Sequence, residues 1–329
     1  MSSLAPCLEA FFSRRLGQQR QASPNTVAAY RDTFRMLLVF VHDRTGKAPS
    51  RLLLEDLDAD VVGAFLEHIE KDRGNGVRTR NARLAAIHSF FKHAAYLHPE
   101  HAALIQRVLS IPAKRCQRSL VSFLDRDELQ AVLAAPDRST LLGRRDHALL
   151  LLAVQTGLRV AELTRLRRQD VHLDDARYLR CLGKGRKERS LPLSRQTAAA
   201  LRVWLSERGG GPEDVLFPSH RGGRLSSDAV QHLVARHVVV ASGRCPSLKG
   251  KQVTPHVLRH TSAMNLLQSG VDIATIALWL GHEEIRTTQV YLHADLALKE
   301  RALARTTPPA TKVGRYRASD SLLAFLDRL

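Results

Sequence analysis

Several cationic side chains of this sequence lie within otherwise apolar segments, where a charge needs either a partner or a function. Arg159 follows a glycine in TGLRVAEL. Burying an unpaired arginine costs several kcal/mol. Two interpretations of Arg159 stay open. It forms an ion pair with Glu162, three residues on, or its planar fork binds two oxygens of a phosphate.

A histidine and an arginine share one face of a second segment. His256 and Arg259 lie three residues apart in TPHVLRHTSAMNLLQSG, close to the start of a helix that opens at Pro255. Helix N-termini attract anions. The spacing of His256 and His260 also fits zinc, but VLR between them lacks the glutamate of HExxH and no cysteine pair completes a site. The sequence therefore predicts no metal site, and hydrogen-bonded histidines remain the ordinary alternative.

A tyrosine near the end of the chain is the third candidate. Tyr291 follows His282 by nine residues, at the start of an amphipathic segment where tyrosine usually packs with a hydrated hydroxyl. A phenol with a pKa near ~10 is a poor nucleophile unless cations or a base help to remove its proton. The arginines, lysine and histidines would provide that environment if they converge, which spacing alone does not establish.

The first 110 residues read as a small helical domain. Ser23-Pro24 is an N-cap followed by proline at the first helical position, and apolar residues then recur at helical spacing. Further helices are expected around 61–69, ending at Gly74-Asn75-Gly76, and over 79–97. Residues 111–121, IPAKRCQRSLV, lack apolar periodicity and are rich in basic side chains, so we expect a linker that lies along phosphates.

Residues 122–305 are expected to form a second, mostly helical domain. A capping box over 125–128 begins its first helix. The segments 177–182 and 189–193 flank GKGRKE and predict a β-hairpin. Three later helices open at Thr254, at Asp272 and near 287 or 288. Residues 306–329 form a tail with an amphipathic SLLAFLDRL segment. The predicted fold class is mainly α with a small β-hairpin, in two domains.

The amino-acid composition and net charge indicate what kind of molecule this protein binds. The 329 residues contain 50 Lys plus Arg and 32 Asp plus Glu, a net charge of +18, with 44% hydrophobic residues. This balance predicts a globular protein with a polyanionic partner, although an arginine-rich surface encoded by a high-GC genome would give the same numbers. Aromatic residues, at 5%, are too few for extensive base stacking. No apolar run approaches ~18 residues, no secretion signal is visible, and the cysteines are scattered. We therefore expect a cytoplasmic protein without a membrane partner.

Four segments, in this order, resemble the signature segments of the tyrosine recombinase (phage integrase) family. They are TGLRVAEL, GKGRKERSLPL, TPHVLRHTSAMNLLQSG and LWLGHEEIRTTQVYLH. The resemblance is close over residues 123–304, and looser over SPNTVAAY…RTRNARLAAI, which is similar to the family's helical core-binding domain. Among subclasses, Xer-like and transposon-borne bacterial integrases are the most similar.

The resemblance implies one nucleophile and five further catalytic residues. Tyr291 would attack a DNA phosphodiester to give a 3′-phosphotyrosyl intermediate and a free 5′-hydroxyl. Arg159 and Arg259 would hold the non-bridging oxygens, and Lys184, which matches better than its basic neighbours, would protonate the leaving oxygen. His256 would serve in proton transfer at the tyrosine, and His282 would hydrogen-bond the phosphate. Further DNA contacts are expected from basic residues of both domains, namely Arg80, Arg83, Lys187 and Arg189.

The resemblance also implies partners and architecture. The two domains would close as a C-shaped clamp on duplex DNA carrying an inverted-repeat site. Four copies would synapse two sites and pass through a Holliday junction, with accessory proteins or partner recombinases in some systems. Neither cofactor, ATP nor catalytic metal is needed. The tail would dock on a neighbouring copy or pack on its own domain. Integration, excision or transposition of mobile DNA is favoured over chromosome-dimer resolution.

Three rival functions remain open. A type IB topoisomerase would relax DNA with the same residues, but the compact domains argue against it. A DNA-binding protein that has lost the chemistry would not need the complete set of candidate catalytic residues. A phosphate-binding metabolic enzyme would leave the net charge and the separate helical domain unexplained. If Tyr291 is not the nucleophile, Tyr316 in the tail is the next candidate.

Overall fold

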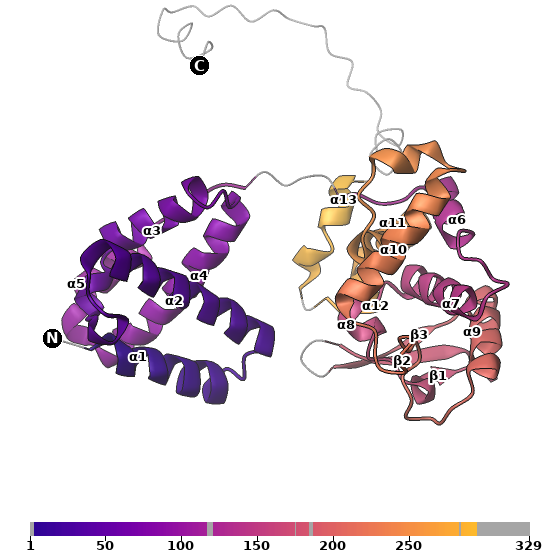
Figure 1. The fold of residues 1–329 in the computed structure, drawn as a ribbon, viewed down its shortest axis with the longest axis horizontal. Coiled ribbons are helices and arrows are strands. Elements are labelled where there is room, and N and C mark those ends of the chain that lie inside the picture. Colours follow the sequence, from indigo (N-terminus) through magenta and orange to yellow (C-terminus); the bar gives the residue numbers. More distant parts are fainter. Residues whose placement is uncertain (1–2, 117–120, 175, 184–186, 283, 295–329) are drawn as a thin grey trace, which may run out of the picture. The chain divides into compact units, whose positions relative to one another are not determined.

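The chain divides into two compact units, residues 1–118 and 119–329 (Figure 1). The computed structural model describes residues 3–116, 121–174, 176–183, 187–282 and 284–294. The division falls within the 111–121 segment expected to be a linker. The fold class expected from the sequence, mainly helical with a small antiparallel sheet, is confirmed.

The described elements of unit 1 are helices, apart from an isolated antiparallel bridge between Ser3 and Leu53. Ser23 caps its longest helix, accepting a hydrogen bond of 3.2 Å from the Thr26 backbone N–H. The helices expected over 61–69 and 79–97 both form, and each is longer than expected. The unit consists of α1 (Leu4–Ala10), a π-helix (Phe11–Gln19), α2 (Pro24–Thr45), α3 (Ala59–Lys71), α4 (Val77–Leu97) and α5 (Ala102–Leu109), with short 3-10 turns at Pro49–Arg51, Leu54–Leu57 and Pro99–His101.

Aromatic rings fill the core of unit 1. Phe34 of α2 and Phe90 of α4 meet edge to face with centroids 5.2 Å apart, and Phe11 lies 5.6 Å from Phe90. Such contacts add to the hydrophobic gain of burial. Arg83 of α4 links the same two helices. It donates hydrogen bonds of 3.0 Å to the Ala29 carbonyl and to the Thr33 hydroxyl, both on α2.

Unit 2 combines helices with one sheet. Its elements are α6 (Arg126–Leu133), α7 (Leu141–Thr156), α8 (Val160–Leu163), β1 (Val171–His172), β2 (Tyr178–Leu182), β3 (Glu188–Pro192), α9 (Arg195–Arg208), α10 (Ser227–Ser242), α11 (Pro255–Gln268), α12 (Ile273–Leu280) and α13 (Val290–Ala294), with 3-10 turns at Arg168–Asp170, Pro246–Gly250 and Ile285–Thr287. The sheet lies at one end of the unit in Figure 1.

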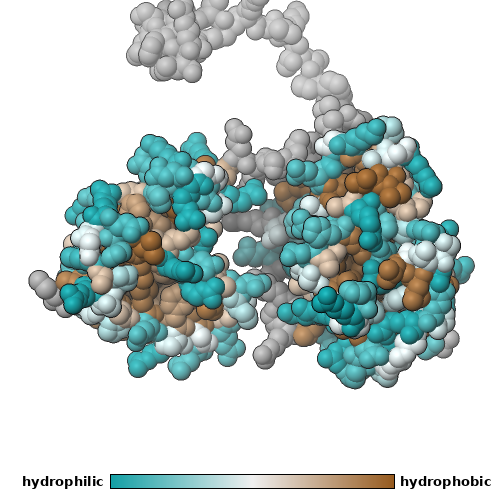
Figure 2. Space-filling model, in the orientation of Figure 1, coloured by the Kyte–Doolittle hydropathy of each residue, from teal (hydrophilic) through white to brown (hydrophobic). Residues whose placement is uncertain are grey.

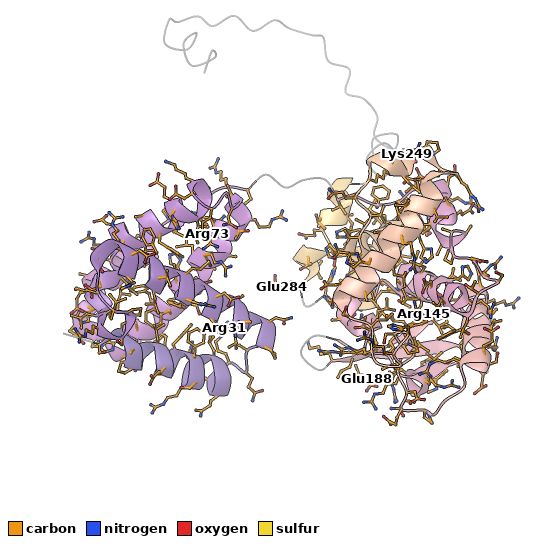
Figure 3. All side chains as sticks on the ribbon, in the orientation of Figure 1. Arg31, Arg73, Arg145, Glu188, Lys249 and Glu284 are labelled. Atoms are coloured by element: carbon orange, nitrogen blue, oxygen red, sulfur yellow. The ribbon has the colours of Figure 1, made fainter. Side chains whose placement is uncertain are left out.

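The expected hairpin is present, and a third strand joins it. Strands β2 and β3 pair antiparallel from Tyr178↔Pro192 to Leu182↔Glu188, and β1 adds to the other edge of β2. Strand β1 is only two residues long, so its sequence carries no alternation that would reveal it. Glu188, labelled in Figure 3, pairs with Arg180 across the two strands at 3.1 Å.

Helix α7 is the central helix of unit 2. Its buried leucines belong to one core together with Leu179 of β2 and Trp204 of α9, whose indole N–H donates to the Leu216 carbonyl at 2.8 Å. Asp146 lies 1% exposed on the same helix. Its carboxylate accepts hydrogen bonds from Arg145 (labelled in Figure 3) and Arg236 and is also hydrogen-bonded to His237. Burial alone would raise the pKa of Asp146, but the contacts with His237 and Arg145 lower it.

Local caps begin the helices that carry the candidate site. Asp125 and Glu128 form the expected capping box of α6, Thr254 caps α11, and the Asp272 carboxylate accepts two backbone N–H bonds at the start of α12. The expected start of the last helix is wrong by two or three residues. A 3-10 turn occupies 285–287, and α13 begins at Val290.

Hydrophilic residues cover most of the face shown in Figure 2, with smaller hydrophobic patches between them. Within the described ranges, every helix is too short or too polar to cross a membrane. The predicted tail, 306–329, with SLLAFLDRL and Tyr316, lies outside the described residues, as does Lys184.

Candidate active site

Arg259 lies at the centre of the site, on the second turn of α11. Its guanidinium donates to the Gly157 carbonyl at 2.6 Å and to the Leu280 carbonyl at 2.9 Å, and the residue is only 3% exposed. Burial, helped by the charge of Arg159, lowers its pKa to about 10. The group therefore stays charged at neutral pH, and its two hydrogen bonds go to neutral carbonyls.

A glycine permits this arrangement. Gly157 ends α7 in the left-handed conformation, with φ of +61°. A Cβ at this position would lie 2.5 Å from the Leu280 side chain. Only glycine therefore lets α7 end against α12 with its last carbonyl directed at Arg259.

Arg159 reaches the same end of α12 from another element. It is the N-cap of α8, and it donates to Glu162 at 3.0 Å and to the Gly281 carbonyl at 3.1 Å. The ion pair left open by the spacing is therefore present. Leu280 and Gly281 are consecutive residues, so the two guanidiniums meet at the C-terminal carbonyls of one helix, where the helix dipole favours cations. The Arg159 side chain keeps 35% of its surface exposed.

Glu162 holds two arginines at once. Besides Arg159, it accepts hydrogen bonds from Arg189 of β3 at 2.9 and 3.3 Å, and it is 7% exposed. These bonds keep the pKa of Glu162 below its usual range, although burial opposes the shift. Arg189 also donates to the Trp279 carbonyl at 3.2 Å. Arg189 thus joins the hairpin to α8 and α12, a contact that no spacing in the sequence indicates.

Tyr291 lies buried beside these cations. Its side chain is 2% exposed in a small core formed by α11, α12 and α13, and a hydrogen bond of 3.0 Å joins its hydroxyl to Nδ1 of His260. Burial raises the pKa of Tyr291, while the charges of Arg259 and Arg159 act in the opposite direction. The sequence predicted for His260 either zinc binding, which it disfavoured, or an ordinary hydrogen bond, and its spacing did not identify Tyr291 as the partner.

The two other candidate histidines flank the arginines. The residue His256 keeps exposed surface, yet its ring meets His260 edge to face at 4.2 Å, and partial desolvation with the charges of Arg259 and Arg159 lowers its pKa. His282 hydrogen-bonds through Nδ1 to the Thr288 hydroxyl at 2.6 Å. Burial, followed by the neighbouring arginine charges, lowers the pKa of His282 to about 4, so its ring is neutral at pH 7.

The structure thus brings five of the six predicted catalytic residues together, namely Arg159, His256, Arg259, His282 and Tyr291. Lys184 falls in 184–186, outside the described residues, and strands β2 and β3 fix the two ends of that turn. No three histidine, cysteine, aspartate or glutamate side chains within the described ranges gather where a metal ion could bind.

The four expected DNA contacts have different surroundings. Lys187 is exposed, as such a contact requires. Arg189 is largely enclosed and pairs with Glu162. Arg80 is 7% exposed and donates to the Pro112 carbonyl at 2.9 Å. The hydrogen bonds described for Arg83 go to Ala29 and Thr33 of α2. Internal contacts thus engage the guanidiniums of these three arginines, because each lies where two elements meet.

Comparison with known proteins identifies the family. The phage integrase family model matches residues 122–297, and the phage integrase N-terminal SAM-like domain model matches residues 9–96. An integrase/recombinase of Sinorhizobium fredii, y4rC, is 58% identical over 328 residues, which cover all of this chain and 99% of the relative. The chain belongs to the phage integrase family. The predicted class of enzyme, a tyrosine site-specific recombinase, is confirmed at this level.

More distant family members extend the comparison. The tyrosine recombinase XerC of Pelobacter propionicus is 34% identical over 87% of this chain and 90% of its own length. Among solved structures, the XerH site-specific recombinase bound to palindromic difH substrate is similar with a TM-score of 0.69 and 23% identity, covering 92% of this chain and 88% of that one. The Tn1549 transposon integrase in complex with a circular intermediate DNA is similar with a TM-score of 0.68 and 15% identity, covering 91% of this chain and 99% of that one. At these identities the structures establish the shared fold.

Proposed function

We propose that this family member cleaves and rejoins duplex DNA through Tyr291, with the phosphate held between Arg159 and Arg259. The observation that carries the proposal is the convergence of two charged guanidiniums on consecutive carbonyls at the end of α12. Neither guanidinium's fork is fully used by an acidic side chain. Two forks with remaining donors suit the non-bridging oxygens of one phosphate.

The chemistry follows from this arrangement. The Tyr291 oxygen attacks the phosphorus, and the bond from phosphorus to the 5′ oxygen breaks. Arg159 and Arg259 stabilise the extra negative charge of the pentavalent transition state. Lys184, on the turn between β2 and β3, gives its proton to the leaving oxygen. The neutral ring of His282 donates a hydrogen bond to the phosphate, and His256 lies at the start of α11, on the exposed side of the same cluster.

The covalent bond conserves the energy of the broken phosphodiester, so rejoining needs no ATP and no metal. Attack by the 5′-hydroxyl of a second duplex would then exchange strands, and two rounds pass through a Holliday junction. We propose a homotetramer on two inverted-repeat sites, with each chain closing its two units around DNA. The 58% identity to an integrase/recombinase, against 34% to a XerC, supports action on mobile DNA.

The central test is covalent trapping on a suicide substrate, a nicked duplex whose cleavage releases a short 5′-hydroxyl fragment. The wild-type chain should become linked to DNA, and Tyr291→Phe should give no linked product while binding the duplex nearly as well. Tyr178→Phe is the matched control, because that ring stacks on His172 in the sheet, away from the site. Linkage by Tyr291→Phe would contradict the proposal and assign the attack to another residue, with Tyr316 examined first.

A second test separates recombination from relaxation. Recombinase function predicts products only from plasmids that carry paired sites taken from inverted repeats beside the gene. Relaxation of supercoiled plasmid by the monomer, without dependence on a site, would favour the type IB topoisomerase alternative.

A further inference from the structure

The hydroxyl of Tyr291 has a specific neighbour that is not among the six residues implied by the family motifs. Nδ1 of His260 lies 3.0 Å from the Tyr291 oxygen, and the two rings are inclined at 67° with centroids 5.5 Å apart. His260 follows Arg259 directly on α11, so the residue that holds the phosphate and the one that contacts the phenol are adjacent in the chain. Within the described residues, His260 is the hydrogen-bond partner of this hydroxyl.

The surroundings of His260 favour a neutral ring. Its pKa is lowered to about 4, first by burial and then by the charges of His256 and Arg259. A neutral imidazole has one acceptor nitrogen, and the tautomer that carries its proton on Nε2 leaves Nδ1 free to accept from the phenol. Among the described residues, the titratable or charged groups near this ring are His256 and Arg259 from α11, Tyr291 from α13 and His282 after α12, whose own pKa the charge of His260 helps to lower.

We propose that His260 is a catalytic residue that accepts the phenolic proton of Tyr291 through Nδ1 as the tyrosine attacks DNA. This inference rests on the proposed function. The bond from the Tyr291 oxygen to phosphorus forms, its O–H proton moves to Nδ1, the bond from phosphorus to the 5′ oxygen breaks, and Lys184 protonates that oxygen. When the strand is rejoined, His260 returns its proton to the phenol.

The arrival of DNA explains how a weak base can accept this proton. In the free protein, the charge of Arg259 opposes protonation of His260. A phosphate bound between Arg159 and Arg259 adds negative charge beside the ring and cancels part of that opposition. The base is thus strengthened only when a scissile phosphate is present. His256, to which the family resemblance assigns proton transfer at the tyrosine, contacts the His260 ring and keeps exposed surface, whereas the hydrogen bond described at the Tyr291 hydroxyl is made by His260.

The experiment compares His260→Asn and His260→Ala with the wild-type chain in single-turnover cleavage of the suicide substrate. Asparagine keeps a hydrogen-bonding atom near the place of Nδ1 but cannot take a proton. Both variants should cleave about 10²–10³-fold more slowly, which is within the range for loss of a general base, with binding unchanged. Their rates should rise with pH as hydroxide removes the phenolic proton, whereas the wild-type rate should be flatter between pH 7 and 9.

A substrate with sulfur at the 5′ bridging position separates the two ends of the reaction, because a thiolate leaves without a proton. Lys184→Ala should regain cleavage on it, while His260→Asn should stay slow. His147→Asn is the matched control, since that ring is also hydrogen-bonded inside unit 2, to the Leu133 carbonyl, and lies outside the site. Thermal melts of all variants identify any loss of folding, and added imidazole should partly restore His260→Ala.

Two results would overturn the inference. Wild-type cleavage by His260→Asn would show that the contact only orients the phenol. A slow His260→Asn with the wild-type pH profile, or one restored by the sulfur substrate, would also exclude proton transfer at the nucleophile. Failure of the proposed function looks different, because the wild-type chain itself would then form no link through Tyr291.

Discussion

Two buried arginines, one in each unit, show how similar sequence contexts produce different electrostatics. Arg80 of unit 1 is 7% exposed, and it donates to the Pro112 carbonyl at 2.9 Å and to Asn81 at 3.1 Å, with a carboxylate oxygen of Glu70 at 4.0 Å. Arg259 of unit 2 is 3% exposed and donates to two backbone carbonyls. Both follow helix starts, and both looked suited to phosphate.

The difference lies in what balances each charge. Glu70 sits beside Arg80 and also binds Lys114 at 2.5 Å, so Arg80 holds the beginning of the interdomain segment against α4 with much of its charge compensated. The two carbonyls beside Arg259 engage two of its donors without adding a negative charge. An arginine fixed by carbonyls therefore keeps a positive field for an arriving anion, while an arginine fixed by a carboxylate is mainly structural.

The largest expected effect is at Arg259. Arg259→Ala should lower single-turnover cleavage by about 10³-fold, because it removes a preorganised donor pair from the transition state. Duplex affinity should change by only a few-fold, since most phosphate contacts come from other residues. Gel-shift titration beside covalent trapping measures both, with Arg259→Lys as a charge-conserving partner. An equal fall in affinity and cleavage would make Arg259 a binding residue.

The second largest effect is expected at Glu162, whose carboxylate balances the charges of Arg159 and Arg189. Glu162→Gln leaves Arg159 and Arg189 without their shared charge, and should cost about 3 kcal/mol of unfolding free energy. Urea unfolding measures this loss. The control is Glu188→Gln, which breaks the exposed pair with Arg180 and should cost under about 1 kcal/mol. Equal losses in the two variants would show that the enclosed position of Glu162 contributes nothing.

A smaller effect is expected in unit 1. Arg80→Ala should cost about 2 kcal/mol, because the buried arginine's packing and its bond to the Pro112 carbonyl are lost and Glu70 keeps, among the described residues, only Lys114 as a cationic partner. Cleavage per bound complex should stay at the wild-type rate. Hydrogen exchange along α4 measures the loosening. Normal stability with abolished DNA binding would instead make Arg80 the direct DNA contact that the sequence suggested.

The smallest expected effect concerns acid. Burial would raise the folded-state pKa of Asp146 and of Glu162, both in unit 2, but their hydrogen bonds to cationic side chains outweigh burial and lower it. Their stabilisation is complete above the unfolded-state pKa near ~4 and disappears as pH falls through the folded-state value. These carboxylates therefore change the stability little between pH 7 and 4. The loss in that range comes from His260 and His282, whose pKa is lowered to about 4, because both rings stay neutral in the folded chain while the unfolded chain takes up protons below ~6.5. Below pH 4 the loss of carboxylate stabilisation adds to this effect, and unit 2 should unfold first. Hydrogen exchange of the full chain across this range checks the order, and earlier opening of α2–α4 would contradict it.

The features visible in the sequence were those fixed by neighbours within a few residues. Ser23, Asp125 and Thr254 cap helices by bonding to backbone three residues on, and Arg159 pairs with Glu162 at the same spacing. The hairpin was equally local. The spacing of residues along the chain is enough to predict such contacts. For this reason the helix starts at these caps, and the Arg159–Glu162 pair that the spacing offered, are found in the structure.

Contacts between distant residues could not be read in this way. Arg189 meets Glu162 across 27 positions, and His260 meets Tyr291 across 31. Both depend on how α11, α12 and the sheet pack on α7, which periodicity does not specify. Resemblance to the family motifs identified the candidate catalytic residues. Only the structure shows that Arg189 pairs with Glu162 and that His260 is the partner of the Tyr291 hydroxyl.

The close approach at Gly157 limits how this recombinase can be altered. Any larger residue there would be strained by the left-handed backbone and would displace the Leu280 side chain, beside the Gly157 and Leu280 carbonyls that hold Arg259. A substitution at Gly157 would thus disturb the surroundings of Arg259 without touching the guanidinium itself. Libraries that seek new DNA targets should keep this glycine constant and place their diversity on exposed positions such as Lys187.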